Sequence, residues 1–225
     1  MPHTYKALGF AGFCKTDIIL YFSRIFHLLG EKVAIIDQSN QEELRHSIPT
    51  GIFTQDRVDY RGVDVFLHSC NSPISNLKLD DYTVLLIDFG VNDKALDCID
   101  DLKALFIVTD CKRHHTVPLS SCISHITSRP DSIRIIRDLV NSKINTRYID
   151  SLLQSSQYTN VIAKYEFGLN ENEHECRLKS QYDDIFKFTR IPGDLKNMLI
   201  DCIMGLFGTE KKAVQKALKK AQRGG

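Results

Sequence analysis

The residues with the clearest chemical potential lie near the N-terminus, in the stretch Gly9-Phe10-Ala11-Gly12-Phe13-Cys14-Lys15-Thr16. Gly9, Lys15 and Thr16 occupy the first glycine, the lysine and the hydroxyl positions of the pattern G-x-x-x-x-G-K-[ST]. In such a loop backbone N–H groups surround an anion, the lysine reaches the outer phosphates and the hydroxyl holds Mg²⁺. The N-terminus of a following helix adds partial positive charge. The stretch therefore predicts a phosphate-binding loop, in which Gly12, Phe13 and Cys14 also contact the nucleotide.

Cys14 departs from this pattern, which has glycine at the same position. A Cβ atom there could crowd the backbone where phosphates approach. Cys14 also lies at a predicted helix N-terminus, where a thiolate is favoured, so a thiol enzyme is one alternative. The sequence places no His or acid to act with it, and a substituted loop glycine is the preferred interpretation. An ordinary strand–turn–helix connection without a ligand is the other alternative.

A second set of residues has the types that bind zinc, namely Cys111, His114, Cys122 and His125. They are spaced as two C-x₂-H pairs, and His115 could substitute for a neighbour. The intervening segment contains Pro118 and several serines, which predicts a loop. A chain with eight His and seven Cys produces such spacings by chance. Ordinary surface or loop residues are therefore the default interpretation, and zinc is disfavoured.

Short apolar runs alternate along the chain with segments of helical period. The predicted strands are 5–10, 32–37, 63–68, 83–88, 104–110, 159–167 and 184–189. The predicted helices are 17–29, 94–102, 132–142 and 194–207. Near-continuous apolar runs are typical of parallel strands buried on both faces. The alternation predicts an α/β fold with a mostly parallel central sheet and helices on both faces.

The composition limits the class of protein. A chain of 225 residues, 43% hydrophobic and 25% charged, suits one globular domain, which we expect to span 1–208. The formal charge of +1 gives no global attraction to nucleic acid or lipid. The cysteines are scattered without a C-x-x-C, and neither a signal peptide nor an apolar run of roughly 20 residues is evident. These features favour a cytoplasmic protein with reduced thiols.

Residues 209–225 form a basic tail, with six Lys and Arg against one acid. Its apolar residues share one helix face, namely Ala213, Val214, Ala217, Leu218 and Ala221. A basic amphipathic helix can lie on an anionic membrane, but this face is shallow and lacks Trp. Docking on a partner protein is the preferred interpretation, with membrane contact or no role as alternatives. DNA binding is disfavoured unless the tail supplies the phosphate contacts.

The order of these segments resembles the ParA/MinD group of P-loop ATPases from about residue 5 to residue 207. Besides the loop, four pieces of sequence carry the resemblance: KVAIIDQSNQ at 32–41, LLIDFG at 85–90, IVTD at 107–110 and IPGD at 191–194. The resemblance implies ATP or ADP with Mg²⁺ as the ligand. It assigns Lys15 to the β/γ-phosphates, Thr16 and Asp88 to Mg²⁺, Asp37 to the neighbourhood of the ion, and Pro192 and Asp194 to the region of the adenine.

Two departures from the family pattern concern catalysis. Phe10 stands where the family has a signature lysine that reaches across a dimer, and Ser39 stands where it has a second aspartate. The late-strand asparagine near the base is not evident in residues 161–164. Phosphoryl transfer depends on positioning and charge stabilisation, so these losses should slow hydrolysis by roughly 10²-fold or more.

The resemblance thus implies a slow or inactive ATPase that positions or regulates a membrane-associated assembly through protein partners. Homodimerisation and a location at the inner face of the membrane are further expectations. Two alternatives stay open. One is a nucleotide-free structural adaptor that docks through its C-terminal helix, and the other is an active ATPase of the ParA/MinD type.

Overall fold

The computed structural model describes residues 5–48, 57–67, 73–182 and 191–223. Their strands form an eight-stranded sheet in the order β3-β4-β2-β5-β1-β6-β7-β8, which is parallel except for the β3–β4 pair. The strands are β1 (Lys6–Gly12), β2 (Val33–Asp37), β3 (Arg57–Tyr60), β4 (Val63–Phe66), β5 (Val84–Gly90), β6 (Leu102–Thr109), β7 (Asp131–Leu139) and β8 (Asn160–Gly168).

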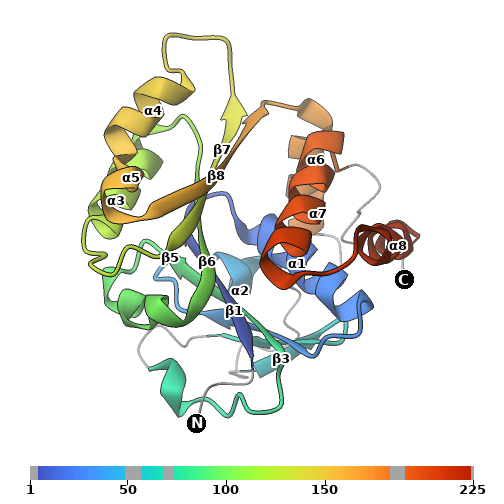
Figure 1. The fold of residues 1–225 in the computed structure, drawn as a ribbon. Helices are drawn as coiled ribbons and strands as arrows, with labels where there is room; N and C mark the ends of the chain where they lie inside the picture. The colour runs from blue at the N-terminus through green and yellow to red at the C-terminus, as the bar shows by residue number, and fades with distance from the viewer. Residues whose placement is uncertain (1–4, 49–56, 68–72, 183–190, 224–225) are drawn as a thin grey trace.

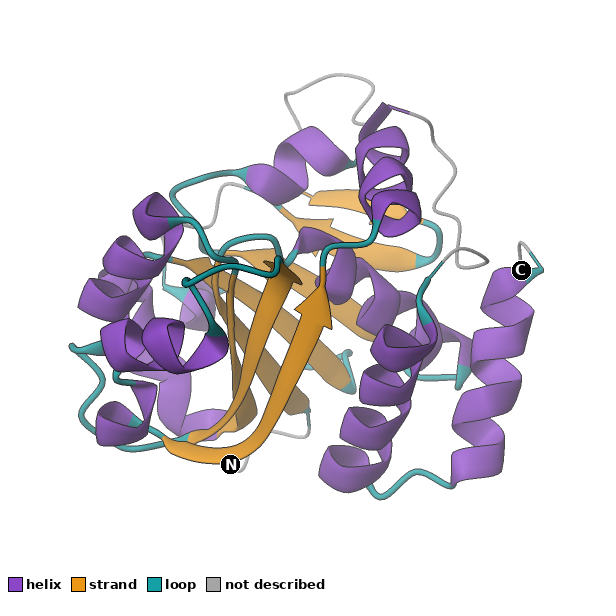
Figure 2. Cartoon of the chain, turned by 90° about the horizontal axis from the view of Figure 1, so that it is seen from above, coloured by secondary structure: helices purple, strands orange, loops and turns teal. Residues whose placement is uncertain are grey.

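Helices cover both faces of the sheet (Figures 1 and 2). One face carries α1 (Thr16–Leu28), α7 (Gly193–Phe207) and α8 (Lys211–Gln222). The other carries α3 (Arg113–Ile123), α4 (Thr146–Leu153) and the 3₁₀ helix η3 (Asp93–Asp101). The remaining helical segments are α2 (Glu43–Ser47), η2 (Ile74–Asn76), α5 (Ser155–Tyr158) and α6 (Glu171–Tyr182). The predicted α/β class with a mostly parallel sheet is confirmed.

Strand β1 lies between β5 and β6 near the middle of the sheet. Its apolar side chains face both sides of the sheet alternately, as a central strand requires. Leu8 and Phe10 contribute to the hydrophobic core beneath α1 and α7. Ala7 and Ala11 contribute to the core on the opposite face. Because successive side chains of a strand point to opposite faces, both layers bury apolar surface on this one strand. The carboxyl end of β1 therefore meets α1 at the centre of the molecule.

The predicted helix 132–142 is wrong, because this segment forms β7. Ile133 and Ile135 pack into one core and Ile136 into the other, as a strand buried on both faces requires. Arg134 and Arg137, each with a side chain only 1% exposed, interrupt the apolar run. These two charged residues gave the segment its apparent helical period, and their partners are distant in sequence.

The segment between Cys111 and His125 was expected to be a loop, but it contains helix α3, with Pro118 inside it. Leu119, Cys122 and Ile123 are buried at helical spacing against the sheet. The predicted helix 94–102 is 3₁₀ rather than α. The predicted strand 184–189 lies outside the described residues, and the other predicted elements differ from the structure only in their ends.

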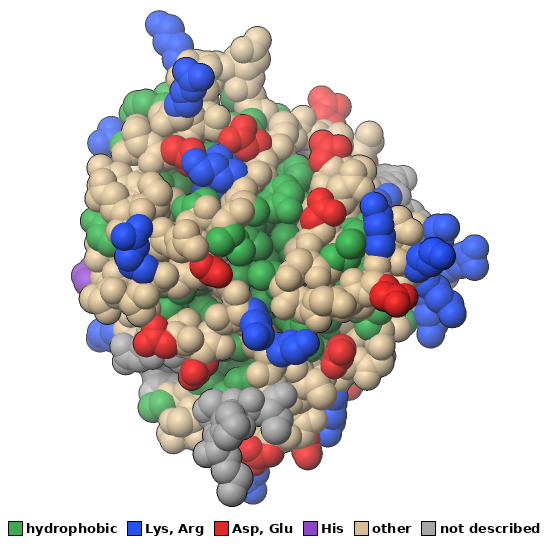
Figure 3. Space-filling model, in the orientation of Figure 1, with side chains coloured by type: hydrophobic (Ala, Val, Ile, Leu, Met, Phe, Trp, Pro, Cys, Tyr) green, Lys and Arg blue, Asp and Glu red, His purple; other side chains and the backbone are tan. Residues whose placement is uncertain are grey.

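Helix α8 folds back after Gly208, which has a φ of +69°, and packs against α1 and α7. Its apolar face is buried, since Val214 and Ala217 are 0% and 4% exposed. The Lys and Arg side chains of the tail lie on the opposite, exposed face, and they gather on that side of the molecule (Figure 3). None of the described helices is of a length and apolarity that would let it traverse a bilayer.

Candidate functional site

The connection between β1 and α1 is shorter than the sequence predicts. Strand β1 continues through Gly12, so only Phe13, Cys14 and Lys15 separate it from α1. Residues 9–11 pair with both β5 and β6, Gly12 pairs with β6, and the amide of Phe13 donates to the carbonyl oxygen of Val108 at 3.0 Å. The backbone of the predicted loop is thus largely committed to the sheet, and the phosphate-binding curl expected from Gly9 onward is not formed.

Gly9 and Gly12 serve close packing in this arrangement. A Cβ atom at Gly9 would lie 2.6 Å from side-chain atoms of both Leu102 and Phe89. A Cβ atom at Gly12, which has a φ of +107°, would lie 2.0 Å from the carbonyl oxygen of Val108. Both glycines therefore allow neighbouring chain segments to approach, which is a different use from cradling an anion.

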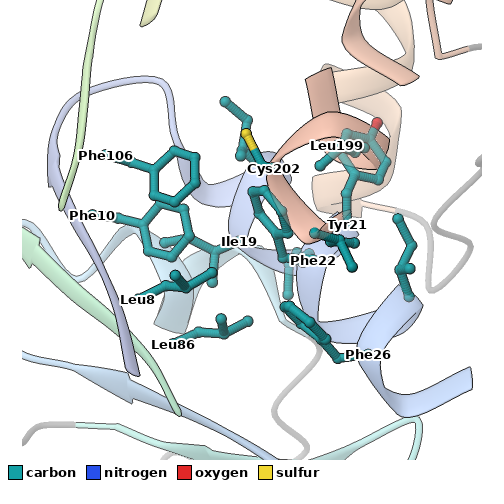
Figure 4. Packing of buried hydrophobic residues seen from close by; sticks show 14 of the residues in the cluster. Leu8, Phe10, Ile19, Tyr21, Phe22, Phe26, Leu86, Phe106, Leu199 and Cys202 are labelled. Carbon is teal, nitrogen blue, oxygen red and sulfur yellow. The ribbon is translucent and has the colours of Figure 1, made fainter. Parts of the chain in front are cut away.

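Phe10 lies in the core rather than beside a ligand (Figure 4). Its side chain is 0% exposed, and its ring stacks on that of Phe106 with centroids 4.8 Å apart. Phe22 of α1 packs against the same pair. Phe10 thus holds the end of β1 against the core.

Lys15 points inward. Its Nζ lies 2.9 Å from Oδ1 of Asp88 and 3.9 Å from Oε2 of Glu43, and both Lys15 and Asp88 are 0% exposed. Burial lowers the pKa of Lys15, but Asp88 and Glu43 together raise it above its ordinary value. Burial raises the pKa of Asp88 to about 6, although Lys15 acts in the opposite direction. The lysine and the strand-end aspartate thus form a buried ion pair.

The other predicted metal-binding groups, on Thr16 and Asp37, make hydrogen bonds to neighbouring residues. The hydroxyl of Thr16 donates to Oε2 of Glu43 at 3.1 Å. Oδ1 of Asp37 accepts hydrogen bonds from the amide and the hydroxyl of Ser39, at 2.9 and 2.7 Å. Burial raises the pKa of Asp37. Within the described residues, Oδ2 of Asp88 is buried and has no hydrogen-bond partner.

Cys14 has a φ of +56°, a conformation that side chains other than glycine rarely adopt. Its carbonyl oxygen accepts a 2.7 Å hydrogen bond from Nη1 of Arg137, and its Sγ lies 3.7 Å from Oδ2 of Asp110. Burial and Asp110 raise the pKa of the Cys14 thiol to about 12. A protonated thiol is a poor nucleophile, which argues against the thiol-enzyme alternative.

Arg137 organises a charged cluster that the sequence gave no reason to expect. Its guanidinium makes two hydrogen bonds to the carboxylate of Asp17, at 2.6 and 2.9 Å, and pairs with Glu173 of α6. Arg137 therefore joins β7, the start of α1 and α6. The only sequence signal was the presence of charged residues in an otherwise apolar run.

A pocket of about 390 Å³ opens at the N-terminus of α1, between α2 and α6. Its lining is charged and includes Thr16, Glu43, Lys112, Asp138 and Arg177. Pro192 and Asp194, predicted near an adenine, lie at the start of α7. Neither is among the residues that line this pocket. The structure thus gathers Cys14, Lys15, Thr16, Asp37 and Asp88 and leaves the predicted base-binding residues apart.

The structure does not unite the predicted zinc ligands either. Cys122 lies on the buried face of α3, whereas His125 is exposed and its Nδ1 lies 2.9 Å from the carbonyl oxygen of Ser121. Across the ranges that the structure describes, no group of three metal-ligating side chains includes Cys111, His114, Cys122 or His125.

Comparison with known proteins shows similarity in structure alone. No protein-family model matches the chain, and no curated protein matches its sequence. A ParA family ATPase from Chlorobium tepidum superposes with a TM-score of 0.56 at 11% identity, over 96% of this chain and 98% of that one.

Two further solved structures cover the chain almost as completely. MinD in the MinC:MinD cell division complex of Aquifex aeolicus has a TM-score of 0.56 at 13% identity, over 91% of this chain and 97% of the other. The McdA–ATP complex from Cyanothece has a TM-score of 0.60 at 12% identity, over 92% and 98%. The chain therefore has a ParA/MinD-like fold, as its sequence pattern predicted.

Proposed function

We propose that this ParA/MinD-like chain positions or regulates an assembly through protein partners and does not work by nucleotide turnover. The observation that carries this proposal is the fully buried ion pair between Lys15 and Asp88. In a phosphate-binding loop the lysine is available to the outer phosphates. Here its charge is already neutralised inside the protein. The lysine of the predicted loop thus stabilises the fold through its pair with Asp88.

The free-energy cost of separating Lys15 from Asp88 disfavours nucleotide binding at this site. Withdrawing Lys15 without supplying another cation would leave Asp88 as a buried charge with no counter-charge, which costs about 3–5 kcal/mol. Each 1.4 kcal/mol weakens binding tenfold, so a nucleotide of micromolar intrinsic affinity that brings no cation to Asp88 would bind only at about millimolar concentration. The amides of residues 9–12 would also have to leave the sheet. In this arrangement the residues do not fit a Mg²⁺–triphosphate.

The groups that would support hydrolysis are missing as well. Phe10 is a core residue, and Ser39 is 1% exposed and hydrogen-bonded to Asp37. Neither can supply a cation across a dimer or a carboxylate that orients water. We therefore expect no nucleotide-dependent dimer and no measurable ATPase activity. A homodimer that forms without nucleotide is compatible with this proposal.

Addition of Mg·ATP or Mg·ADP at 1 mM is expected to leave the thermal midpoint of the full chain unchanged. A ligand present at 100 times its dissociation constant would stabilise the native state by about 2.7 kcal/mol, which raises the midpoint by several degrees. Thermal unfolding with MgCl₂ alone, and with sodium sulfate at matched ionic strength, provides the controls. A nucleotide-specific rise of several degrees would refute the proposal.

One observation favours a second candidate function, which is nucleotide binding after the loop opens. Oδ2 of Asp88 is buried without a hydrogen-bond partner among the described residues, as a carboxylate awaiting a hydrated cation would be. The same thermal experiment discriminates between the two functions. A nucleotide-dependent shift that requires Mg²⁺ would establish this candidate instead.

Helix α8 is the proposed docking element. Its exposed Lys and Arg residues fit an acidic surface on a partner. The apolar face that would have to enter a bilayer is packed on α1 and α7. Membrane contact through α8 of the folded protein is therefore expected to be electrostatic, in keeping with a cytoplasmic protein that visits the membrane through an assembly.

Any pelleting of the protein with anionic vesicles is thus expected to vanish at 0.5 M salt, because screening removes charge attraction but not apolar insertion. It should also vanish when the exposed lysines 211, 212, 216, 219 and 220 are replaced by Gln. Vesicles of zwitterionic lipid serve as the control. Pelleting that resists salt would show that α8 inserts and would contradict the proposed role.

A further inference from the structure

Three metal-ligating side chains from distant parts of the chain meet beside the β1–α1 connection. Cys14, Asp110 and His115 each offer one ligand atom, and these atoms all lie within 4.8 Å of one another. Sγ of Cys14 lies 3.7 Å from Oδ2 of Asp110, and Nδ1 of His115 lies 2.9 Å from Oδ1 of the same carboxylate. Asp110 directly follows β6, and His115 lies in the first turn of α3.

The cluster is close to the dimensions of a metal site. With metal–ligand bonds of about 2.3 Å to sulfur and 2.0–2.1 Å to nitrogen and oxygen, a tetrahedral angle places two ligand atoms about 3.3–3.5 Å apart. Sγ of Cys14 and Nδ1 of His115 approach different oxygens of Asp110, at 3.7 and 2.9 Å, and one ligand atom from each of the three residues lies within 4.8 Å of the other two. Side-chain rotations that shorten the longest separation by about 1 Å would bring the three atoms around one ion.

The surroundings hold the three ligands in place. The ring of His115 stacks on that of Phe13, with centroids 4.3 Å apart and planes 11° apart. Asp110 is 1% exposed, and its Oδ1 also accepts a 2.9 Å hydrogen bond from the amide of Lys112. Such outer contacts orient metal ligands before the ion arrives.

The competing cation is easily displaced. Nζ of Lys112 lies 3.0 Å from Oδ2 of Asp110, but the lysine side chain is 57% exposed. Because the head group of Lys112 already contacts water, it can turn into solvent when a metal cation takes its place beside the buried carboxylate. The pocket lined by Cys14 and Lys112 leaves room for water as a fourth ligand.

We propose that Cys14, Asp110 and His115 bind a transition-metal ion such as Zn²⁺, with a fourth coordination position open to the pocket. Mixed sulfur, nitrogen and oxygen ligands suit Zn²⁺ and Co²⁺ better than Mg²⁺. Cys14 is then a ligand at the place where the family's loop has glycine. The inference does not depend on the proposed adaptor function.

The test is a Zn²⁺ titration of the metal-free, reduced full chain in competition with a chromophoric chelator. One equivalent per chain is expected to bind. The variants Cys14→Ser and His115→Ala should each bind at least about 100-fold more weakly, which exceeds the roughly 10–100-fold loss from removing an outer contact. Co²⁺ should give a thiolate-to-metal charge-transfer absorption in the wild type and none in Cys14→Ser.

Matched controls lie next to the proposed ligands. Cys111→Ser and His114→Ala remove the same side-chain types at positions next to Asp110 and His115, and they are expected to leave Zn²⁺ affinity within about twofold of the wild-type value. Circular dichroism confirms that each variant is folded. Absence of stoichiometric binding to the wild type, or unchanged affinity in Cys14→Ser, would overturn the proposal.

Discussion

Replacement of Lys15 by Met is expected to lower the free energy of unfolding by about 3–5 kcal/mol at pH 7.5, measured by urea denaturation. The substitution removes one partner of a pair in which both side chains are 0% exposed. Asp88 would then be a buried charge with no counter-charge, and the penalty of such a charge sets this range. A lysine in an open loop would behave differently, because surface substitutions usually change stability by no more than about 0.5 kcal/mol.

This loss of stability should shrink as the pH falls. Burial raises the pKa of Asp88 to about 6 in the wild type, above its ordinary value of 3.8, and Lys15 opposes the rise. Without Lys15 the native carboxyl group binds its proton still more tightly than the unfolded one does. The free energy of unfolding of the variant therefore increases, relative to the wild type, as the pH is lowered from 7.5 towards 5.

The double variant Lys15→Met/Asp88→Asn provides the control. It removes both charges, so it should recover at least about 2 kcal/mol of the loss. Asp88→Asn alone completes the double-mutant cycle, and it remains measurable if Lys15→Met does not fold. A wild-type-like stability of Lys15→Met at pH 7.5 would show that the lysine is not locked inside the protein.

Replacement of Arg137 by Met is expected to cost a similar amount, about 3–5 kcal/mol. Arg137 is 1% exposed, and its partners Asp17 and Glu173 have side chains only 8% and 6% exposed. Its loss would leave two buried carboxylates facing one another, with no cation between them. Because the pair between Arg137 and Glu173 fixes α6 against β7, its loss should also accelerate amide hydrogen exchange in α6.

Arg134→Met is the matched control for this experiment. Arg134 lies three residues earlier on β7 and is equally buried, but its partners Asp150 and Glu166 are 29% and 44% exposed. Water can solvate these carboxylates when the arginine is removed, so the expected loss is only about 1–2 kcal/mol, as for hydrogen bonds to partly exposed charged groups. An equal decrease in the free energy of unfolding of the two variants would contradict the prediction that burial of the acidic partners sets the cost.

The sequence predicted most of the sheet because its parallel strands are buried on both faces and read as continuous apolar runs. Strand β7 escaped detection, since Arg134 and Arg137 find their acidic partners on α1, α4, α6 and β8. Short-range patterns in the sequence cannot predict ion pairs between residues that are far apart along the chain.

The candidate site was predictable only in part. The family resemblance placed Lys15, Thr16 and Asp88 in one site, and they lie together in the structure, but it did not indicate that Lys15 pairs with Asp88 or that Thr16 donates to Glu43. One signal was present, because the alternation of Leu8, Phe10 and the small residues between them continues the strand beyond Gly9. The contact of Cys14 with Asp110, 96 residues away, depends on the ends of β1 and β6 meeting. Spacing in the sequence cannot report that contact.

A crystal structure of the full chain grown with an excess of a Mg·ATP analogue tests the central claim most directly. We expect Nζ of Lys15 to stay about 2.9 Å from Oδ1 of Asp88, and residues 9–11 to stay paired with β5 and residues 9–12 with β6. A structure in which Lys15 contacts phosphate oxygens and the backbone from Gly9 to Thr16 curves around them would contradict it.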